Sequence, residues 1–329
     1  MLHLASAFLS RGFSPVVMTP ESIHRRISAT NEDLGITFLA LSDGQDRPDA
    51  PPSDFFSIEN SMENIMPPQL ERLLLEEDLD VACVVVDLLA SWAIGVADRC
   101  GVPVAGFWPV MFAAYRLIQA IPELVRTGLV SQKGCPRQLE KTIVQPEQPL
   151  LSAEDLPWLI GTPKAQKKRF KFWQRTLERT KSLRPLHNQE ATNNITITKT
   201  SFWEEDMSCL GESNIQTLAL ALEASGRPFL WALNRVWQEG LPPVASSRRL
   251  LCYPVAGDQF VNCKYIVDVW KIGVRLSGFG EKEVEDGLRK VMEDQDMGER
   301  LRKLRDRAMG NEARLSSEMN FTFLKNELN

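Results

Sequence analysis

The sequence lacks the features by which several protein classes are recognised. Its six cysteines form no Cys-x-x-Cys pair, and no apolar run approaches the ~20 residues that a helix needs to span a bilayer. A disulfide framework, a zinc-ligand pattern and a helical membrane protein are therefore excluded as readings of the sequence. The net charge of −5 gives no overall positive field that would gather nucleic acid. We expect no membrane span, no resident metal and no nucleic-acid partner.

Short catalytic and nucleotide-binding signatures are also missing. No Gly-x-x-x-x-Gly-Lys loop, no Gly-x-Ser-x-Gly turn and no His-Glu-x-x-His motif occurs. The histidines His3, His24 and His187 lie far apart, with no nucleophile beside them. Gly278-Phe279-Gly280 lacks the third glycine of a dinucleotide fingerprint and precedes a helical pattern, so it indicates a turn. A nicotinamide-dependent oxidoreductase stays open as an alternative, although this absence argues against it.

The composition that remains is that of a globular α/β protein. Hydrophobic residues make up 43% of the chain and charged residues 25%, and 329 residues predict two domains at roughly 100–200 residues each. Residues 81–86 are continuously apolar and β-branched, which is typical of a parallel strand covered on both faces. Strand patterns alternate with helical ones, which predicts a doubly wound sheet. The expected strands are 13–18, 36–41, 81–86, 102–108, 229–233, 250–254 and 273–276. The expected helices are 1–10, 55–77 with an interruption at Pro67-Pro68, 91–100, 111–126, 213–225, 260–270, 281–294 and 297–310, with a further helix opened by Thr19-Pro20.

Asp87 is the first candidate functional residue, because it ends the apolar strand 81–86. Ligands of open α/β sheets bind in the crevice beyond the carboxyl ends of the strands. A carboxylate at that place can orient a catalytic histidine and stabilise its protonated form. Aspartate is also a common helix N-cap. The spacing alone leaves both roles open.

A second polar pair follows the strand-like residues 250–254. Asp258 can accept hydrogen bonds from two vicinal hydroxyls, and Gln259 can both donate and accept. Such a pair suits a sugar. The alternative is a turn in which Asp258 caps the helix 260–270, and the two roles can coexist.

Residues 164–175 carry six basic side chains with three aromatic residues among them. Basic and aromatic side chains together can bind single-stranded nucleic acid. Phe170, Trp173 and Leu177 fall at helical spacing, however, which predicts a helix with one apolar face and a solvated basic back. The acidic balance of the whole chain favours the helix.

Longer stretches of the sequence resemble the plant UDP-dependent glycosyltransferases. The resemblance covers nearly the whole chain and implies a GT-B fold of two Rossmann-like doubly wound domains. It implies an acceptor-binding domain over 1–184, a linker over 185–210, the remnant of a UDP-sugar domain over 211–310, and a final helix over 311–329 that returns to the first domain. The motifs that carry it include Leu9-Ser10-Arg11-Gly12-Phe13, Val86-Asp87-Leu88-Leu89-Ala90-Ser91-Trp92-Ala93, Phe107-Trp108-Pro109, Asp155-Leu156-Pro157, Phe229-Leu230-Trp231 and Pro254 to Gln259 with Asn262.

The same resemblance implies roles for single residues. Asp87 matches the aspartate that holds the histidine base of the family, and Trp108 lies near the acceptor pocket. Asp258 and Gln259 match the pair that binds the hydroxyls of the donor sugar. The implied reaction transfers a sugar, glucose by expectation, from a UDP-sugar to a hydroxyl of a small hydrophobic acceptor. The UDP-sugar is a co-substrate, so no cofactor is expected, and the cysteine usage predicts a cytoplasmic, reducing compartment.

The sequence departs from the family pattern at several places. The family's first strand, which ends in Gly-His and supplies the base, has no counterpart here. Internal segments are missing at the junctions 184/185, 211/212 and 243/244, and the last would carry Trp-Ala-Pro-Gln for uracil and His-Cys-Gly-Trp-Asn-Ser for the diphosphate. We therefore expect two incomplete domains and an inactive, internally deleted glycosyltransferase, such as a truncated isoform. The alternative is a non-catalytic remnant that binds a small molecule or a protein partner.

Overall fold

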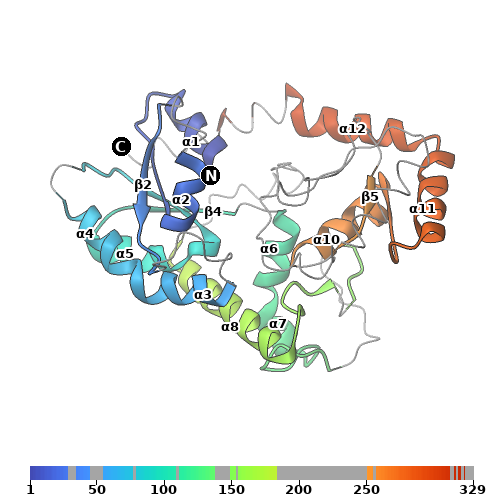
Figure 1. Cartoon of the computed structure of the whole chain (residues 1–329), viewed down its shortest axis with the longest axis horizontal. Coiled ribbons are helices and arrows are strands. Elements are labelled where there is room, and N and C mark those ends of the chain that lie inside the picture. Colours follow the sequence, from blue (N-terminus) through green and yellow to red (C-terminus); the bar gives the residue numbers. More distant parts are fainter. Residues whose placement is uncertain are drawn as a thin grey trace. The chain divides into compact units, whose positions relative to one another are not determined.

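The structure is a computed structural model of the chain. It describes residues 1–28, 35–44, 55–76, 79–108, 111–137, 149–152, 155–183, 250–254 and 257–311, together with residues 315, 318, 319 and 322. The chain divides into two compact units (Figure 1). Unit 1 consists of Met1–Pro109, Arg175–Pro185 and Lys325–Asn329, and unit 2 of Val110–Gln174 and Leu186–Leu324.

Unit 1 alternates helices with parallel strands, as the sequence pattern predicts. Strand β1 pairs with β2, and strand β3 pairs with β4, so its described strands form two separate two-stranded sheets. Helix α2 packs on the first sheet and helix α5 on both strands of the second. In chain order the elements are α1 (Leu2–Leu9), β1 (Val16–Pro20), α2 (Glu21–Ser28), β2 (Thr37–Leu41), α3 (Phe55–Asn60), the π-helix η2 (Ser61–Ile65), α4 (Pro67–Leu74), β3 (Val84–Asp87), the 3₁₀-helix η3 (Leu88–Ala90), α5 (Trp92–Cys100) and β4 (Val104–Phe107).

The turn between α5 and β4 depends on a glycine. Gly101 ends α5 with φ 71° and ψ 17°, in the left-handed region, and its N–H bonds to the carbonyls of the last helical turn. Glycine adopts this conformation without the steric cost of a Cβ atom. The chain can therefore reverse at once and place β4 beside β3.

The helical pattern over 55–77 is interrupted at Pro67-Pro68, as predicted, because a proline lacks the N–H that would continue the preceding helix; it is also divided at Ser61, where the π-helix η2 begins. Two expectations for unit 1 are wrong. Thr19 and Pro20 are not the N-cap and first residue of a helix but the last residues of strand β1, and the expected helix, α2, begins directly after them at Glu21. Residues Val84 and Val85 of β3 are only half-buried, since a two-stranded sheet has too little cover to enclose both faces.

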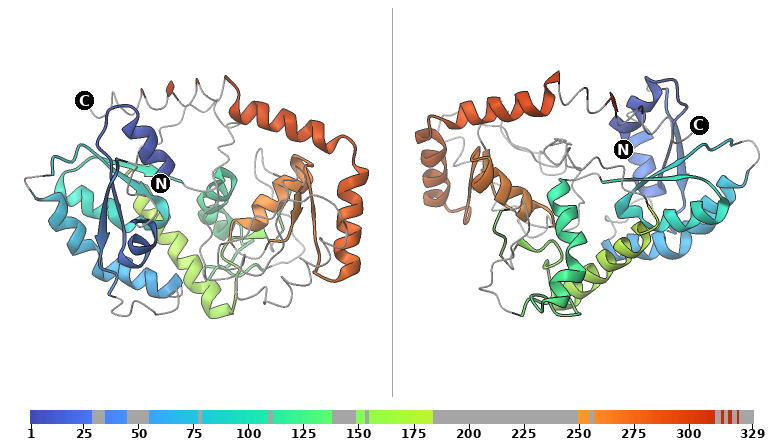
Figure 2. Two further views of the ribbon diagram at one scale, coloured as in Figure 1. Left: turned by 45° about the horizontal axis from the view of Figure 1, so that its top comes forward. Right: turned by 180° about the vertical axis from the view of Figure 1, so that it is seen from behind.

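Unit 2 holds a third parallel pair, β5 and β6. Helix α11 packs against both strands (Figure 2). The helix expected over 111–126 breaks at Ala120, two residues before Pro122, and that expected over 260–270 becomes a short α-helix followed by a π-helix. The elements are α6 (Phe112–Gln119), α7 (Ile121–Arg126), α8 (Pro163–Thr180), β5 (Leu250–Cys252), α10 (Gln259–Lys264), the π-helix η8 (Tyr265–Val269), β6 (Gly273–Arg275), α11 (Glu281–Glu293) and α12 (Met297–Met309).

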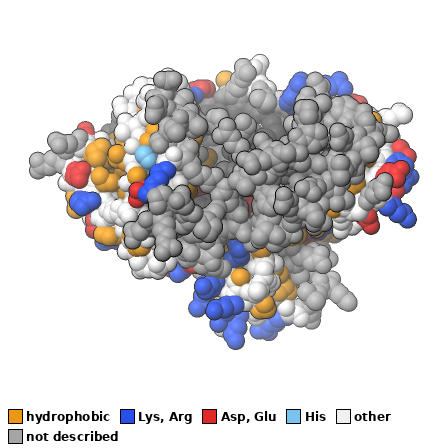
Figure 3. Space-filling model, in the orientation of Figure 1, with side chains coloured by type: hydrophobic (Ala, Val, Ile, Leu, Met, Phe, Trp, Pro, Cys, Tyr) orange, Lys and Arg blue, Asp and Glu red, His pale blue; other side chains and the backbone are white. Residues whose placement is uncertain are grey.

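Helix α8 confirms the amphipathic interpretation of the basic segment. Phe170 and Phe172 are buried, and Phe170 packs on the ring of Trp158 with 5.2 Å between centroids. Exposed Lys and Arg side chains gather over α8 on the surface (Figure 3). The buried rings are not available to stack on bases. Residues up to Gln174 of this helix belong to unit 2 and those from Arg175 to unit 1.

Several expected elements lie outside the described residues. They are the helix 213–225, the strand 229–233, the linker 185–210 and most of the final helix 311–329. The three junctions at 184/185, 211/212 and 243/244 lie there too. The predicted domain boundaries stay a prediction.

Candidate functional site

The first candidate site lies at the carboxyl edge of the β3–β4 sheet. Asp87, the last residue of β3, is paired in register with Phe107, the last residue of β4. Trp108 follows Phe107 directly, so Asp87 and Trp108 leave the same edge of the same sheet. The structure therefore brings together two of the residues that the sequence singled out.

The Asp87 carboxylate is held by the turn that follows it. Its Oδ1 atom accepts a hydrogen bond of 3.0 Å from the backbone N–H of Leu89, which makes Asp87 the N-cap of η3. Burial raises the pKa of Asp87, and the Leu89 N–H and the amino group of Met1 at the start of α1 act in the opposite direction. The capping role left open by the sequence is thus confirmed. Since capping uses Oδ1, it does not exclude a second role for Oδ2.

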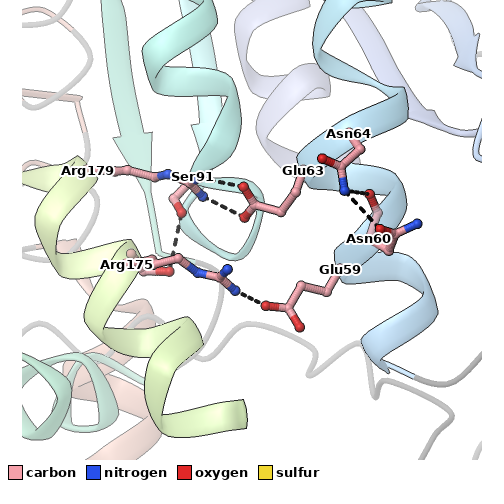
Figure 4. A network of polar contacts seen from close by, with 8 residues as sticks. Glu59, Asn60, Glu63, Asn64, Ser91, Arg175 and Arg179 are labelled. Atoms are coloured by element: carbon pink, nitrogen blue, oxygen red, sulfur yellow. Dashed lines mark hydrogen bonds and ion pairs between the residues drawn. The ribbon is translucent and has the colours of Figure 1, made fainter.

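Helix α8 fixes the chain just beyond Asp87. Ser91, which follows η3, shares a buried hydrogen bond of 3.3 Å with Thr176 of α8. Arg179 of α8 donates two hydrogen bonds of 2.9 and 2.6 Å to Glu63 (Figure 4). Arg175 forms an ion pair with Glu59 in the same network. These contacts join residues more than eighty positions apart: the Ser91–Thr176 bond holds the turn after Asp87, and the two ion pairs hold α8 on α3 and η2.

The second candidate site begins at the turn before α10. Asp258 stands at the N-cap position of α10, but its side chain makes no cap hydrogen bond. Instead its Oδ2 atom accepts a bond of 2.6 Å from Nδ2 of Asn262, one helical turn further on. The interpretation of Asp258 as a capping side chain is therefore wrong. The position is that of a cap, but the side chain turns along the helix toward Asn262.

Burial raises the pKa of Asp258, and the hydrogen bond from Asn262 acts in the opposite direction. Gln259 is the first residue of α10 and therefore adjoins Asp258 at the same helix end. The structure thus keeps the predicted sugar-binding pair together. This pair belongs to unit 2, and the Asp87–Trp108 pair belongs to unit 1.

Asn262 is the residue that sequence reasoning used least. In the sequence it is part of the motif that follows Pro254, and in the structure its side chain donates to Asp258. Its Oδ1 atom is buried and has no hydrogen-bond partner. The i, i+4 spacing of Asp258 and Asn262 was the available signal, because residues four apart are neighbours on a helix.

No histidine donates to Asp87 among the side chains that the structure describes, which include that of His24 in α2. Within the same residues, no three His, Cys, Asp or Glu side chains come together as ligands of a metal ion would. None of the helices in the described part of the chain is both long enough and apolar enough to cross a bilayer.

The fold and the sites define an α/β protein with carboxylates placed after the ends of parallel strands, where such proteins bind ligands. Solved structures confirm the GT-B fold. Os79 from O. sativa, solved in complex with UDP, matches with a TM-score of 0.64 and 17% identity over 100% of this chain and 96% of that one. UGT2 of Phytolacca americana, solved with UDP-2fluoro-glucose and pterostilbene, gives a TM-score of 0.65 and 14% identity over 98% and 95%.

Relatives with known names show the family. UDP-glycosyltransferase 82A1 of Arabidopsis thaliana is 75% identical, in an alignment that covers 100% of this chain and 95% of the relative. UDP-glycosyltransferase 76B1 of the same plant is 23% identical over 92% of this chain and 88% of its own length. No protein-family model matches the chain. The chain belongs to the plant UDP-glycosyltransferases.

Proposed function

We propose that this chain is a catalytically inactive member of its family. The family reaction would transfer glucose from a UDP-sugar to a hydroxyl of a small hydrophobic acceptor, with Asp87 beside the base and Asp258 and Gln259 on the donor sugar. This chain keeps those residues but lacks the segments that would bind uracil and the diphosphate. Loss of the diphosphate contacts removes stabilisation of the leaving group, which is commonly the largest catalytic contribution.

The length of the alignment with UDP-glycosyltransferase 82A1 is the observation that carries this proposal. The alignment runs over 439 positions, whereas the chain has 329 residues, so about 110 positions of the relative face no residue here. Because the alignment covers the whole chain, the unmatched positions of the relative fall between aligned residues of this chain. These unmatched positions amount to about a quarter of the alignment. At 75% identity, the positions that are not identical also amount to about a quarter. This supports internal deletion rather than gradual divergence.

The sheets of unit 1 give independent support. A doubly wound sheet is continuous, whereas the described strands of unit 1 form two separate pairs, and Val84 and Val85 of β3 stay half-buried. An incomplete sheet positions a catalytic edge less firmly than a continuous one.

A non-catalytic role as a binding protein is the second candidate. The aromatic side chain of Trp108, at the carboxyl edge of the β3–β4 sheet, supports binding of a small apolar molecule. We also propose a cytoplasmic location, supported by the free cysteines 83, 100, 135, 252 and 263.

The test is UDP release from UDP-glucose in the presence of a panel of small apolar hydroxylated compounds. UDP-glycosyltransferase 82A1 of Arabidopsis thaliana, assayed in parallel, serves as the positive control. We expect acceptor-dependent UDP release from the relative and none from this chain. Release by this chain that is lost in Asp87→Asn but kept in Asp98→Asn, an exposed aspartate of α5, would overturn the proposal.

A second measurement concerns the origin of the missing segments. Sequencing transcripts across the junctions 184/185, 211/212 and 243/244 should show these residues joined in mature transcripts. Transcripts that contain only the intervening coding sequence would show that the deleted chain is not made.

A further inference from the structure

The α10–η8 helical segment lies directly on the β5–β6 sheet. Gly273 of β6 has no side chain, and a Cβ atom there would lie 2.7 Å from Cγ2 of Ile266 in η8 and 3.0 Å from Cβ of Leu250 in β5. Such distances leave no room for a larger residue. The backbone N–H of Ile272 also donates to the carbonyl of Ile266 at 2.9 Å. The helical segment therefore approaches the sheet as closely as backbone and side chains allow.

Two cysteines meet in this interface. Cys263 lies in α10, one helical turn before Ile266, and is only 4% exposed. Cys252 is the last residue of β5 and lies two positions beyond Leu250, hence on the same face of the strand. Because Leu250 and Ile266 both approach Gly273, the side chains of Cys252 and Cys263 lie in the same interface between the sheet and the helical segment. Both are free.

We propose that Cys252 and Cys263 are a redox modification site, which hydrogen peroxide converts to an intramolecular disulfide. In the first step the Cys263 thiolate attacks one oxygen of the peroxide, forms an S–O bond and breaks the O–O bond, so that a sulfenic acid forms and, with a proton, water leaves. In the second step the Cys252 sulfur attacks the Cys263 sulfur, and the hydroxyl leaves as water with the Cys252 proton. Two thiols are oxidised and one peroxide is reduced to two waters.

The environments of the two thiols assign their roles. The hydrogen bond from Cys252, with the nearby positive charge of Arg275, lowers the pKa of Cys263, which favours its thiolate. The same hydrogen bond and burial raise the pKa of Cys252. The thiolate is the nucleophile in such oxidations, so Cys263 reacts first and Cys252 resolves the intermediate.

The disulfide would enclose residues 253–262, the segment that contains Asp258 and Gln259. Oxidation would therefore cross-link the sheet to the helix that begins with the proposed donor-sugar pair. The thiol pair exists whether or not the chain turns over a sugar, so failure of the proposed function leaves this inference standing.

The experiment is a thiol count and a disulfide map of the full chain before and after mild treatment with hydrogen peroxide. In denaturant, the number of free thiols should fall by two from the six of the reduced chain. Non-reducing peptide mapping should show one new cross-link, between the peptides that contain Cys252 and Cys263, and dithiothreitol should restore both thiols. This measurement needs no variant and so does not depend on a variant that folds.

Three variants sharpen the result. Cys252→Ser and Cys263→Ser should each keep all five remaining thiols free of disulfide after the same treatment. Cys135→Ser, which removes an exposed thiol of the same unit, should still lose two. A cross-link that involves Cys83, Cys100 or Cys209 instead, or no cross-link in the native chain while Cys135 is oxidised, would overturn the proposal.

Discussion

The two candidate sites start from the same sequence pattern and are held in different ways. Asp87 and Asp258 both follow a parallel strand and precede a helix, and burial raises the pKa of each. Asp87 accepts from the backbone N–H of Leu89 and so caps η3. Asp258 accepts from the side chain of Asn262 and caps nothing.

The difference shows that the position of a carboxylate after a strand does not determine its role, either as a helix cap or as a ligand-binding group. Where a 3₁₀ turn follows at once, as after Asp87, the nearest free donor is a backbone N–H. Where an amide side chain stands one helical turn ahead, it can satisfy the carboxylate in place of the backbone. The first arrangement is fixed by local backbone geometry, whereas the second can be removed by a single substitution.

The largest expected effect is a loss of stability when the packing of α5 on the β3–β4 sheet, which ends in Asp87, is weakened. Ile94 of α5 is 1% exposed, and α5 packs on both β3 and β4. Ile94→Ala should lower the free energy of unfolding by about 2–5 kcal/mol, because it leaves a cavity in the core. Urea unfolding monitored by tryptophan fluorescence would measure this.

Leu75→Ala is the matched control, since Leu75 follows the neighbouring helix α4 and is 64% exposed. Its effect should stay within about 0.5 kcal/mol. Equal losses in the two variants would show that α5 does not support the β3–β4 edge.

The next effect separates the two carboxylates. Asn262→Leu removes the donor to Asp258 and should cost about 1–3 kcal/mol at neutral pH, because it leaves a partly buried carboxylate without its partner. The pKa of Asp258 should rise further, since the hydrogen bond from Asn262 lowers it. Chemical denaturation gives the first quantity and NMR titration of the carboxyl carbon the second.

Asn64→Leu is the control for this change. Asn64 is exposed and makes the same i, i+4 contact, with 2.8 Å from its Nδ2 to Oδ1 of Asn60. Its loss should change stability by no more than about 0.5 kcal/mol. If Asn262→Leu leaves the pKa of Asp258 where it was, the hydrogen bond is not what holds this carboxylate.

The smallest expected effect is a gain in stability. Because the folded-state pKa of Asp87 and of Asp258 is raised above the unfolded value, each carboxyl stabilises the fold when protonated, and this contribution is lost as pH rises through the folded-state pKa. Asp87→Asn and Asp258→Asn remove the buried charge and keep an oxygen that can accept. Each should raise the melting temperature at neutral pH by at most about 2–4 °C.

The pH dependence of this gain in stability tests whether removal of the buried charge is its cause. The gain of either variant over the native chain should shrink as the pH is lowered toward the ordinary carboxyl range, where the native aspartates also become neutral. Asp98→Asn, at an exposed position of α5, should show no such trend. A gain that is the same at all pH values would contradict the assignment to burial of charge.

Most of the described strands and helices could be predicted from the sequence, because their signals are local. The apolar run before Asp87 and the helical spacing of Phe170, Trp173 and Leu177 each report an element within a few residues. The predictions failed where proline and the cover of a strand decided the outcome. Pro20 is the last residue of a strand, and the expected helix begins directly after it at Glu21; Val84 and Val85 lack the second layer that a buried parallel strand needs.

By itself the sequence determined which residues stand at strand ends and which family the chain resembles, since both are written in short contiguous patterns. Only the tertiary structure decided what those residues touch. The Ser91–Thr176 bond, the meeting of Cys252 with Cys263 and the partial burial of both aspartates depend on segments that meet through packing. A hydrogen bond needs its partner within about 3 Å, and burial exists only after neighbours have displaced water, so neither can be read from one segment alone.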